Sequence, residues 1–327
     1  MKNVVFAAAL MMLPAFAAGK STRPAYQVVH GWPILPEGRV LGQTTAVAVD
    51  SHGDIWVFHR AERMWTEPLP TDPIKDDTVA IFDARTGQLK RTWGANLFAM
   101  PHGLTIDRHD NVWLTDLSLQ QVFKFSPSGK LLFAVGERGV AGNDERHFNR
   151  PTDVAVTADG GFYVSDGYIN TRIMKFDANG HFQFQWGQKG TGPGEFDLPH
   201  AVALDSAGRV YVADRANARV QVFDGKGNYL SQWKSADLGR PYSLAVVGND
   251  RAVVVDGGDQ PDHLPDRSGA AVVDLSGHVL SKFGRYGNQD GQFDLAHDVI
   301  MDKQGAIYIV DTWGQRVQKF VPSRRAH

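Results

Sequence analysis

The segment HGLTIDRHDNVWLTD at 102–116 joins two short apolar stretches through a polar turn. The same arrangement recurs as TDVAVTADGGFYVSD at 152–166, HAVALDSAGRVYVAD at 200–214 and HDVIMDKQGAIYIVD at 297–311. Weaker copies begin at Thr45 and Tyr242. Short apolar runs separated by Gly, Asn and Asp are typical of β-hairpins. The sequence therefore predicts one β unit that is repeated six times.

Most copies continue into two further strands. A third strand ends in Phe, as in RIMKF at 172–176, and a fourth ends in an aromatic residue, as in FQFQW at 182–186. No stretch has a convincing helical period. Four strands in each unit of roughly 40–50 residues, repeated six times, predict an all-β protein with the fold of a six-bladed β-propeller.

The two ends of the chain indicate how the ring closes. The sixth copy stops after its third strand, RVQKF at 316–320, whereas YQVVHGW at 26–32 resembles the fourth strands of the other copies. We expect this N-terminal strand to complete the last blade, which leaves no open seam in the ring. The propeller is expected to span 26–322 and to be followed by a short tail, 323–327.

The N-terminus has the features of a secretory signal peptide. Lys2 precedes an apolar stretch at 4–16, and AFA at 15–17 has the small-x-small pattern of a cleavage site. The stretch is shorter than the roughly 18 residues that a membrane span requires. We therefore expect a cleavable signal over 1–18, a linker over 19–25, and a secreted or periplasmic protein.

The composition excludes several classes of protein. Hydrophobic residues make up 43% of the 327 residues and charged residues 21%, which excludes a disordered polymer. A formal charge of −2 gives no basic surplus for a nucleic acid or an acidic membrane. The chain has no cysteine, so any metal must be held by histidines and carboxylates.

Histidines recur at equivalent positions of the repeat. The first strand of each propeller blade lines the central channel, so six anchor positions form a ring at one mouth; they are Thr45, His102, Thr152, His200, Tyr242 and His297. The three histidines fall in alternate blades, about 120° apart in a six-bladed ring. Three imidazoles directed at one axis predict a metal site with positions left for water or substrate. Zinc is the first expectation, with copper, iron and manganese left open.

The loop after each second strand lies on the same face as the histidines, because the first strand runs away from that mouth and the second returns. Three of these loops carry Arg60, Tyr168 and Arg215, and the two arginines occupy matching positions in their copies. Insertions at 63–77 and 257–267 also follow second strands. We expect both insertions to wall a pocket over the histidine mouth.

These residues resemble the motifs of the peptidyl-α-hydroxyglycine α-amidating lyases, six-bladed propellers of the NHL-repeat type. PHGLTID, PHAVALD and AHDV, around the three histidines, resemble the metal-ligand motifs of that family. His59-Arg60 with Trp65, SDGY ending at Tyr168, and ADRANAR at 213–219 match three further segments. The resemblance covers nearly the whole predicted propeller and indicates a bacterial, stand-alone member.

The resemblance implies a lyase that cleaves the C–N bond of a C-terminal α-hydroxyglycine and gives a peptide amide and glyoxylate. The three ligands of the catalytic zinc would be His102, His200 and His297. Arg60 would bind the substrate carboxylate, a role suited to a planar guanidinium. Tyr168 would act as general base, with zinc and the neighbouring Arg215 supplying the positive charge that favours its ionised form.

The resemblance also implies a structural calcium ion deeper in the channel. By position its ligands would be the Asp298 carboxylate and the carbonyls of Val47 and Leu104, hard oxygen donors that suit calcium. Two of the departures from the family pattern lie just before His297. Leu295 stands where a methionine commonly lies near the substrate, and Ala296 replaces a proline.

Three functions follow from these observations. The first is a zinc lyase that acts on a hydroxyglycine-type carbinolamide, either a peptide or a small N-acyl compound. The second is a metal-dependent hydrolase of an ester or lactone that uses the same three histidines. The third is a non-catalytic propeller that binds a protein or an envelope ligand on its face. We expect a monomer that binds neither nucleic acid nor a membrane.

Overall fold

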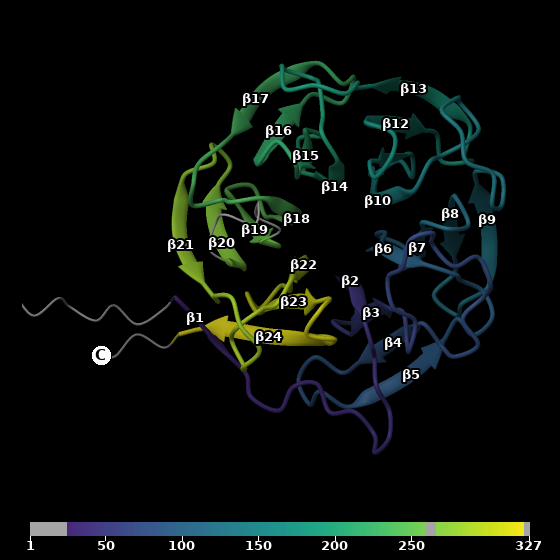
Figure 1. The fold of residues 1–327 in the computed structure, drawn as a ribbon. Helices are drawn as coiled ribbons and strands as arrows, with labels where there is room; N and C mark the ends of the chain where they lie inside the picture. Colours follow the sequence, from purple (N-terminus) through teal and green to yellow (C-terminus); the bar gives the residue numbers. More distant parts are fainter. Residues whose placement is uncertain (1–24, 259–265, 324–327) are drawn as a thin grey trace, which may run out of the picture.

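The computed structural model describes residues 25–258 and 266–323, so the expected signal peptide over 1–18 lies outside the described residues, as do most of the expected linker and tail. The described part contains strands and no helix, and none of it forms a helix that could cross a membrane. Its strands form six four-stranded antiparallel sheets arranged around one axis (Figure 1). The all-β, six-bladed propeller predicted from the repeats is confirmed.

The blades follow one another around the ring in chain order. Blade 1 contains β2 (Thr44–Val49), β3 (Ile55–His59), β4 (Val79–Phe82) and β5 (Leu89–Trp93). Blade 2 contains β6 (Pro101–Ile106), β7 (Val112–Asp116), β8 (Gln121–Phe125) and β9 (Leu131–Val135). Blade 3 contains β10 (Pro151–Val156), β11 (Phe162–Asp166), β12 (Arg172–Phe176) and β13 (Phe182–Trp186). Blade 4 contains β14 (Pro199–Leu204), β15 (Val210–Asp214), β16 (Arg219–Phe223) and β17 (Tyr229–Trp233).

Blades 5 and 6 complete the circle. Blade 5 contains β18 (Pro241–Val247), β19 (Arg251–Asp256), β20 (Gly269–Asp274) and β21 (Val279–Phe283). Blade 6 contains β22 (Ala296–Met301), β23 (Ile307–Asp311), β24 (Arg316–Pro322) and, as its outer strand, β1 (Tyr26–Val28).

Burial explains the apolar pattern of each repeat. The second strands are buried at nearly every position because the faces of neighbouring blades pack against them, as in β7 and β23. The outer strand β13 alternates between half-buried and exposed side chains. Aromatic rings fill the space between blades; the Trp113 ring of blade 2 lies 4.6 Å from the Phe162 ring of blade 3, centroid to centroid. The core is therefore a set of layers between adjacent sheets.

The N-terminal strand closes the ring, as predicted. β1 pairs antiparallel with β24, and Gln27 lies opposite Val321. The ring of Tyr26 packs 5.0 Å from that of Phe283, which belongs to blade 5. The first and last described strands therefore share one blade (Figure 1).

A β-bulge interrupts the first strand of every blade at or beside its anchor residue. The register with the second strand shifts between Thr44 and Ala46, Pro101 and Leu104, Pro151 and Asp153, Pro199 and Ala201, Pro241 and Ser243, and Ala296 and Asp298. A bulge leaves one residue out of the ladder and changes the direction of its side chain. The six bulges therefore release the six anchor residues from regular pairing at the mouth of the channel.

Closure can be tested with a disulfide, since the chain has no cysteine of its own. We expect the pair Gln27→Cys and Val321→Cys, which lie opposite each other in β1 and β24, to raise the melting temperature when oxidised. The bridge would close a loop of nearly the whole propeller, which corresponds to about 3–5 kcal/mol. Gln27→Cys alone is the control. A bridge that fails to form, or forms without raising the melting temperature, would contradict this pairing.

Candidate active site and metal centre

The three anchor histidines meet at one mouth of the channel. The ring centroids of His102 and His200 lie 4.9 Å apart, those of His102 and His297 4.9 Å, and those of His200 and His297 4.8 Å. One ring nitrogen from each histidine lies within 4.8 Å of the other two, and all three side chains are buried. The structure therefore brings together the ligand set predicted from the repeats.

Each histidine is oriented by a hydrogen bond to the next blade. The Nδ1 atoms of His102, His200 and His297 lie 2.8, 2.7 and 2.6 Å from the carbonyl oxygens of three other anchor residues, which are Thr152, Tyr242 and Thr45 respectively. A carbonyl only accepts hydrogen bonds, so each Nδ1–H must donate. Each Nε2 is therefore unprotonated and can offer its lone pair to a metal, the arrangement common among metal-binding histidines.

Burial keeps the three rings neutral. Burial, followed by the positive charge of Arg60, lowers the pKa of His297 to about 3. The pKa values of His102 and His200 also lie well below the usual value, from burial first and the neighbouring His297 second. Neutral imidazole is the form that binds metals. These residues therefore fit a divalent transition metal.

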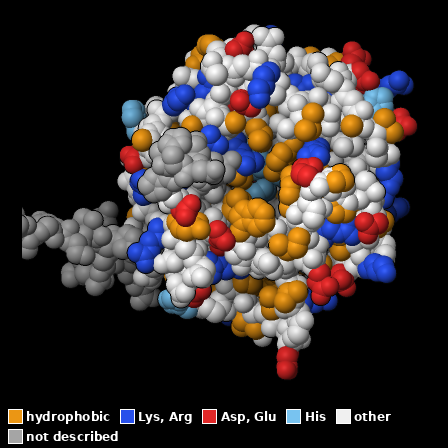
Figure 2. Space-filling model, in the orientation of Figure 1, with side chains coloured by type: hydrophobic (Ala, Val, Ile, Leu, Met, Phe, Trp, Pro, Cys, Tyr) orange, Lys and Arg blue, Asp and Glu red, His pale blue; other side chains and the backbone are white. Residues whose placement is uncertain are grey.

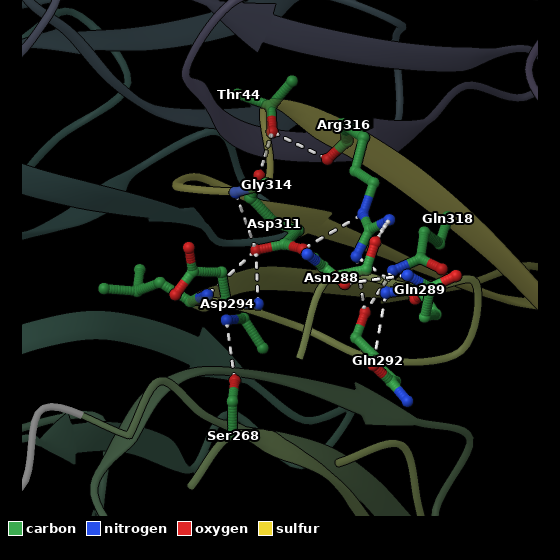
Figure 3. A network of polar contacts seen from close by, with 12 residues as sticks. Thr44, Ser268, Asn288, Gln289, Gln292, Asp294, Asp311, Gly314, Arg316 and Gln318 are labelled. Carbon is green, nitrogen blue, oxygen red and sulfur yellow. Dashed lines mark hydrogen bonds and ion pairs between the residues drawn. The ribbon is translucent and has the colours of Figure 1, made fainter. Parts of the chain in front are cut away.

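A buried aspartate at the end of the second strand holds the loops around the mouth. In blade 6, Asp311 Oδ1 accepts hydrogen bonds from the N–H groups of Leu295 (2.9 Å) and Gly314 (3.2 Å), while Oδ2 accepts one from Arg316 Nε (3.1 Å) (Figure 3). This carboxylate joins the segment that leads into His297 to the loop that follows β23. Equivalent aspartates in blades 2 to 5 are Asp116, Asp166, Asp214 and Asp256.

A cavity of about 250 Å³ opens above the histidines. It is lined by Arg60, Tyr168, Arg215, Leu295 and His297, together with Trp65, Tyr242, Thr312 and Trp313. Figure 2 shows a hollow in this face, with a histidine at its base and hydrophobic side chains around it. A larger hollow of about 610 Å³ is lined by none of these residues. The structure thus gathers the predicted loop residues and Leu295 around one cavity that reaches the histidine site.

Arg60 presents a fixed positive charge to this cavity. The side chain is buried, its Nη1 donates to Gln43 Oε1 (2.9 Å), and its Nε donates to the Pro101 carbonyl (3.1 Å). Its guanidinium carbon lies 5.3 Å from the centre of the Trp65 ring. Burial lowers the pKa of Arg60 to about 10, so the group is still charged at pH 7.

Tyr168 reaches the nitrogens that a metal would use. Its hydroxyl oxygen lies 3.3 Å from Nε2 of His102 and 3.4 Å from Nε2 of His200. Its ring packs against the Trp65 ring, with centroids 5.4 Å apart. A group bound at the histidines would therefore lie next to this hydroxyl.

Arg215 lies on the opposite side of the mouth from Arg60. Each arginine is the first residue after a second strand, β3 in blade 1 and β15 in blade 4. The guanidinium carbon of Arg215 lies 3.9 Å from the centre of the Tyr242 ring, and its charge contributes to the lowered pKa of His200. The cavity thus carries positive charge on two sides.

The insertion at 63–77 forms part of the cavity wall. Trp65 lines the cavity, and the nearby Glu67 is held to blade 3 by a double hydrogen bond from Arg150 (2.8 and 2.9 Å). Most of the second insertion, 257–267, lies outside the described residues. The expected contribution of this second insertion to the wall stays a prediction.

The channel below the histidines contains two buried carboxylates. Asp298 lines a cavity of about 240 Å³ together with Val47, Leu104 and Asp153. The Asp298 carboxylate accepts a hydrogen bond from the N–H of Val47 (2.9 Å). Burial raises the pKa of Asp298 to about 6; burial and the charge of Asp298 raise that of Asp153 to about 8. The channel thus contains two buried carboxylates, and carboxylate oxygens are ligands that suit a hard cation.

Sequence reasoning missed Asp153 and Trp313. Asp153 follows the anchor Thr152 as Asp298 follows His297, so comparing TDV with HDV could have found it. Trp313 belongs to the loop after the second strand of blade 6, the same class of loop that carries Arg60, Tyr168 and Arg215. Its apolar side chain has no charged or acid–base group to single it out in the sequence.

The chain is similar to known proteins in sequence and in fold. The NHL repeat model matches residues 196–223. The chain is 37% identical to peptidyl-alpha-hydroxyglycine alpha-amidating lyase 2 of Drosophila melanogaster over 81% of this chain and 68% of that protein. It is 33% identical to peptidyl-glycine alpha-amidating monooxygenase A of Xenopus laevis over 88% of this chain and 32% of that protein, and so spans about a third of that longer relative.

A solved structure agrees on the fold alone. A gluconolactonase from Xanthomonas campestris superimposes with a TM-score of 0.62, covers 93% of this chain and 96% of its own, and is 12% identical. At this identity the match shows only that the two proteins share the propeller architecture. The sequence relatives are much more similar and extend along most of the chain. They confirm the resemblance seen in the motifs: the chain belongs to the peptidyl-α-hydroxyglycine α-amidating lyase family.

Proposed function

We propose that the protein is a zinc-dependent lyase that cleaves the C–N bond of an α-hydroxyglycine group and releases an amide and glyoxylate. The observation that carries this proposal is the position of the Tyr168 hydroxyl, 3.3–3.4 Å from Nε2 of both His102 and His200. As a proton acceptor, Tyr168 would lie beside the bound metal and in the same cavity as the buried Arg60. The named lyase relatives support the same chemistry.

The three histidines would hold the zinc ion through Nε2. Bound zinc supplies Lewis acidity, which makes the hydroxyl of the substrate more acidic. The chain contributes the orientation of this site through its three Nδ1–H donors, which are satisfied by carbonyls of the neighbouring blades. No rearrangement of the rings is needed to expose their lone pairs.

Arg60 would bind the substrate carboxylate. Its guanidinium is planar and already fixed by Gln43 and Pro101, so little side-chain freedom is lost when a carboxylate binds. A carboxylate on Arg60 orients the α-carbon of the substrate toward Tyr168 and the histidines.

Tyr168, as the phenolate, would take the proton of the α-hydroxyl. The electron pair of that O–H bond then forms the C=O bond of glyoxylate, the C–N bond breaks, and its electron pair stays on nitrogen. The nitrogen gains the proton that Tyr168 has taken and leaves as the amide, which restores the phenolate. Arg215 adds positive charge to the same cavity, next to the developing negative charge of the substrate.

We also propose that the protein acts outside the cytoplasm, because the sequence at 1–18 has the pattern of a secretory signal. We propose that it acts as a monomer, since one chain supplies the three histidines and the residues around the cavity.

Glyoxylate release from α-hydroxyhippurate tests the proposed reaction. We expect the purified, zinc-loaded protein to release it, and Tyr168→Phe to lower kcat by about 10²–10⁴, the usual contribution of a general base. Tyr229→Phe, on the outer strand β17, is the matched control and should keep full activity. An active Tyr168→Phe protein would exclude this base. Hydrolysis of esters or lactones without glyoxylate release would favour the hydrolase instead. A protein that binds no metal and shows neither activity would favour a binding module.

We propose a calcium ion in the channel below the histidines. Its ligands would be the Asp298 carboxylate and the carbonyls of Val47 and Leu104, and Asp153 would add a second negative charge nearby. Calcium would offset the cost of burying two carboxylates together.

Thermal unfolding with added calcium tests this site. At 100 times its Kd, calcium should stabilise the folded protein by about 2.7 kcal/mol, which raises the melting temperature by several degrees. Asp298→Asn should abolish most of that rise, while the exposed-site control Asp290→Asn should keep it. An equal rise in the Asp298→Asn protein would contradict the assignment.

A further inference from the structure

One position of the repeat is aromatic in only two opposite blades. The second residue after the second strand is small in four blades, where it is Ala61, Ser118, Ala216 or Gly258. In blade 3 it is Tyr168 and in blade 6 it is Trp313. Blades 3 and 6 face each other across the six-membered ring (Figure 1), and both aromatic side chains line the cavity above the histidines. The repeat thus places Trp313 across the mouth from the proposed base.

Trp313 is exposed but held on a fixed turn. The residue is 46% exposed. The preceding Thr312 donates its N–H to the Leu295 carbonyl (3.0 Å) and its hydroxyl to the Thr44 carbonyl (2.8 Å). The following Gly314 donates its N–H to Asp311 (Figure 3). A large apolar ring that projects from a fixed turn and is left partly in water can serve as a binding surface.

The cavity has an apolar side that suits the acyl part of the substrate. Arg60 would take the carboxylate, and Tyr168 with the histidines would take the hydroxyl, which leaves the amide nitrogen and its acyl group. Leu295 and Trp313 form an uncharged wall on the side of blade 6, next to His297. Since Trp313 stands at the solvent end of this wall, an acyl group that leaves the site on that side would contact it.

We propose that Trp313, with Leu295, binds the side chain of the residue that precedes the hydroxyglycine and selects large apolar or aromatic groups there. This proposal rests on the proposed lyase function and specifies its substrate class. Trp313 acts on substrate binding and does not take part in proton transfer, so its removal should raise KM for an aromatic substrate and leave kcat nearly unchanged.

The test compares two substrates, N-acetyl-Phe-α-hydroxyglycine and N-acetyl-Ala-α-hydroxyglycine, by their kcat/KM for glyoxylate release. We expect the parent protein to prefer the Phe substrate about tenfold or more, the discrimination typical of an apolar pocket. In Trp313→Ala the preference should fall to within about twofold, through a higher KM for the Phe substrate. Trp313→Phe should restore most of it.

Leu280→Ala is the matched control, because Leu280 is another exposed apolar residue, 59% exposed, on the outer strand β21. It should keep the parent preference. A parent protein without preference, or a preference that survives Trp313→Ala in protein with an unchanged melting temperature, overturns the assignment of Trp313 and leaves the lyase function intact. If neither substrate releases glyoxylate, the proposed function fails and this inference fails with it.

Discussion

Closure of the six-bladed ring is the constraint on which the site depends. The three histidines are separated by roughly a hundred residues each along the chain, and no local contact could bring them together. Pairing of β1 with β24 fixes all six first strands around one axis. Alternate blades then place three imidazoles at one mouth, with ring centroids less than 5 Å apart.

The blades between the histidines orient these rings. Blades 1, 3 and 5 contribute the carbonyls of their own anchor residues to the Nδ1–H donors. A bulge at each of these anchors takes the residue out of the regular ladder. Its carbonyl can therefore accept a hydrogen bond from a histidine in the channel. The six-fold repeat thus becomes a three-fold site, in which alternate blades supply ligands and supports.

The chemistry of the mouth is carried by loops that buried aspartates hold in place. Asp311 and its equivalents tie the segment before the first strand to the loop after the second. Functional residues on loops need a rigid support if their geometry is to be maintained. Here the support is polar and repeated, whereas Arg60, Tyr168, Arg215 and Trp313 differ from blade to blade. Variation at one or two loop positions is therefore enough to build a specific site on a regular scaffold.

The repeats and the positions of the histidines could be predicted from the sequence, because the period of a propeller fixes where each residue lies around the ring. The closing strand at 26–28 was predictable for the same reason: the last copy lacked a fourth strand. The Nδ1 hydrogen bonds and the bulges could not be predicted from the sequence, because they depend on side-chain direction and on contacts between blades. Asp153 and Trp313 become visible when corresponding positions of different blades are compared.

Diffraction from crystals of the zinc-loaded protein, with anomalous scattering measured across the zinc absorption edge, tests the central claim most directly. The account predicts one zinc peak at the mouth of the channel, about 2.0–2.1 Å from Nε2 of His102, His200 and His297, with the three Nδ1 atoms still bonded to carbonyls. A peak bound through Nδ1, or zinc located away from these three rings, would contradict it.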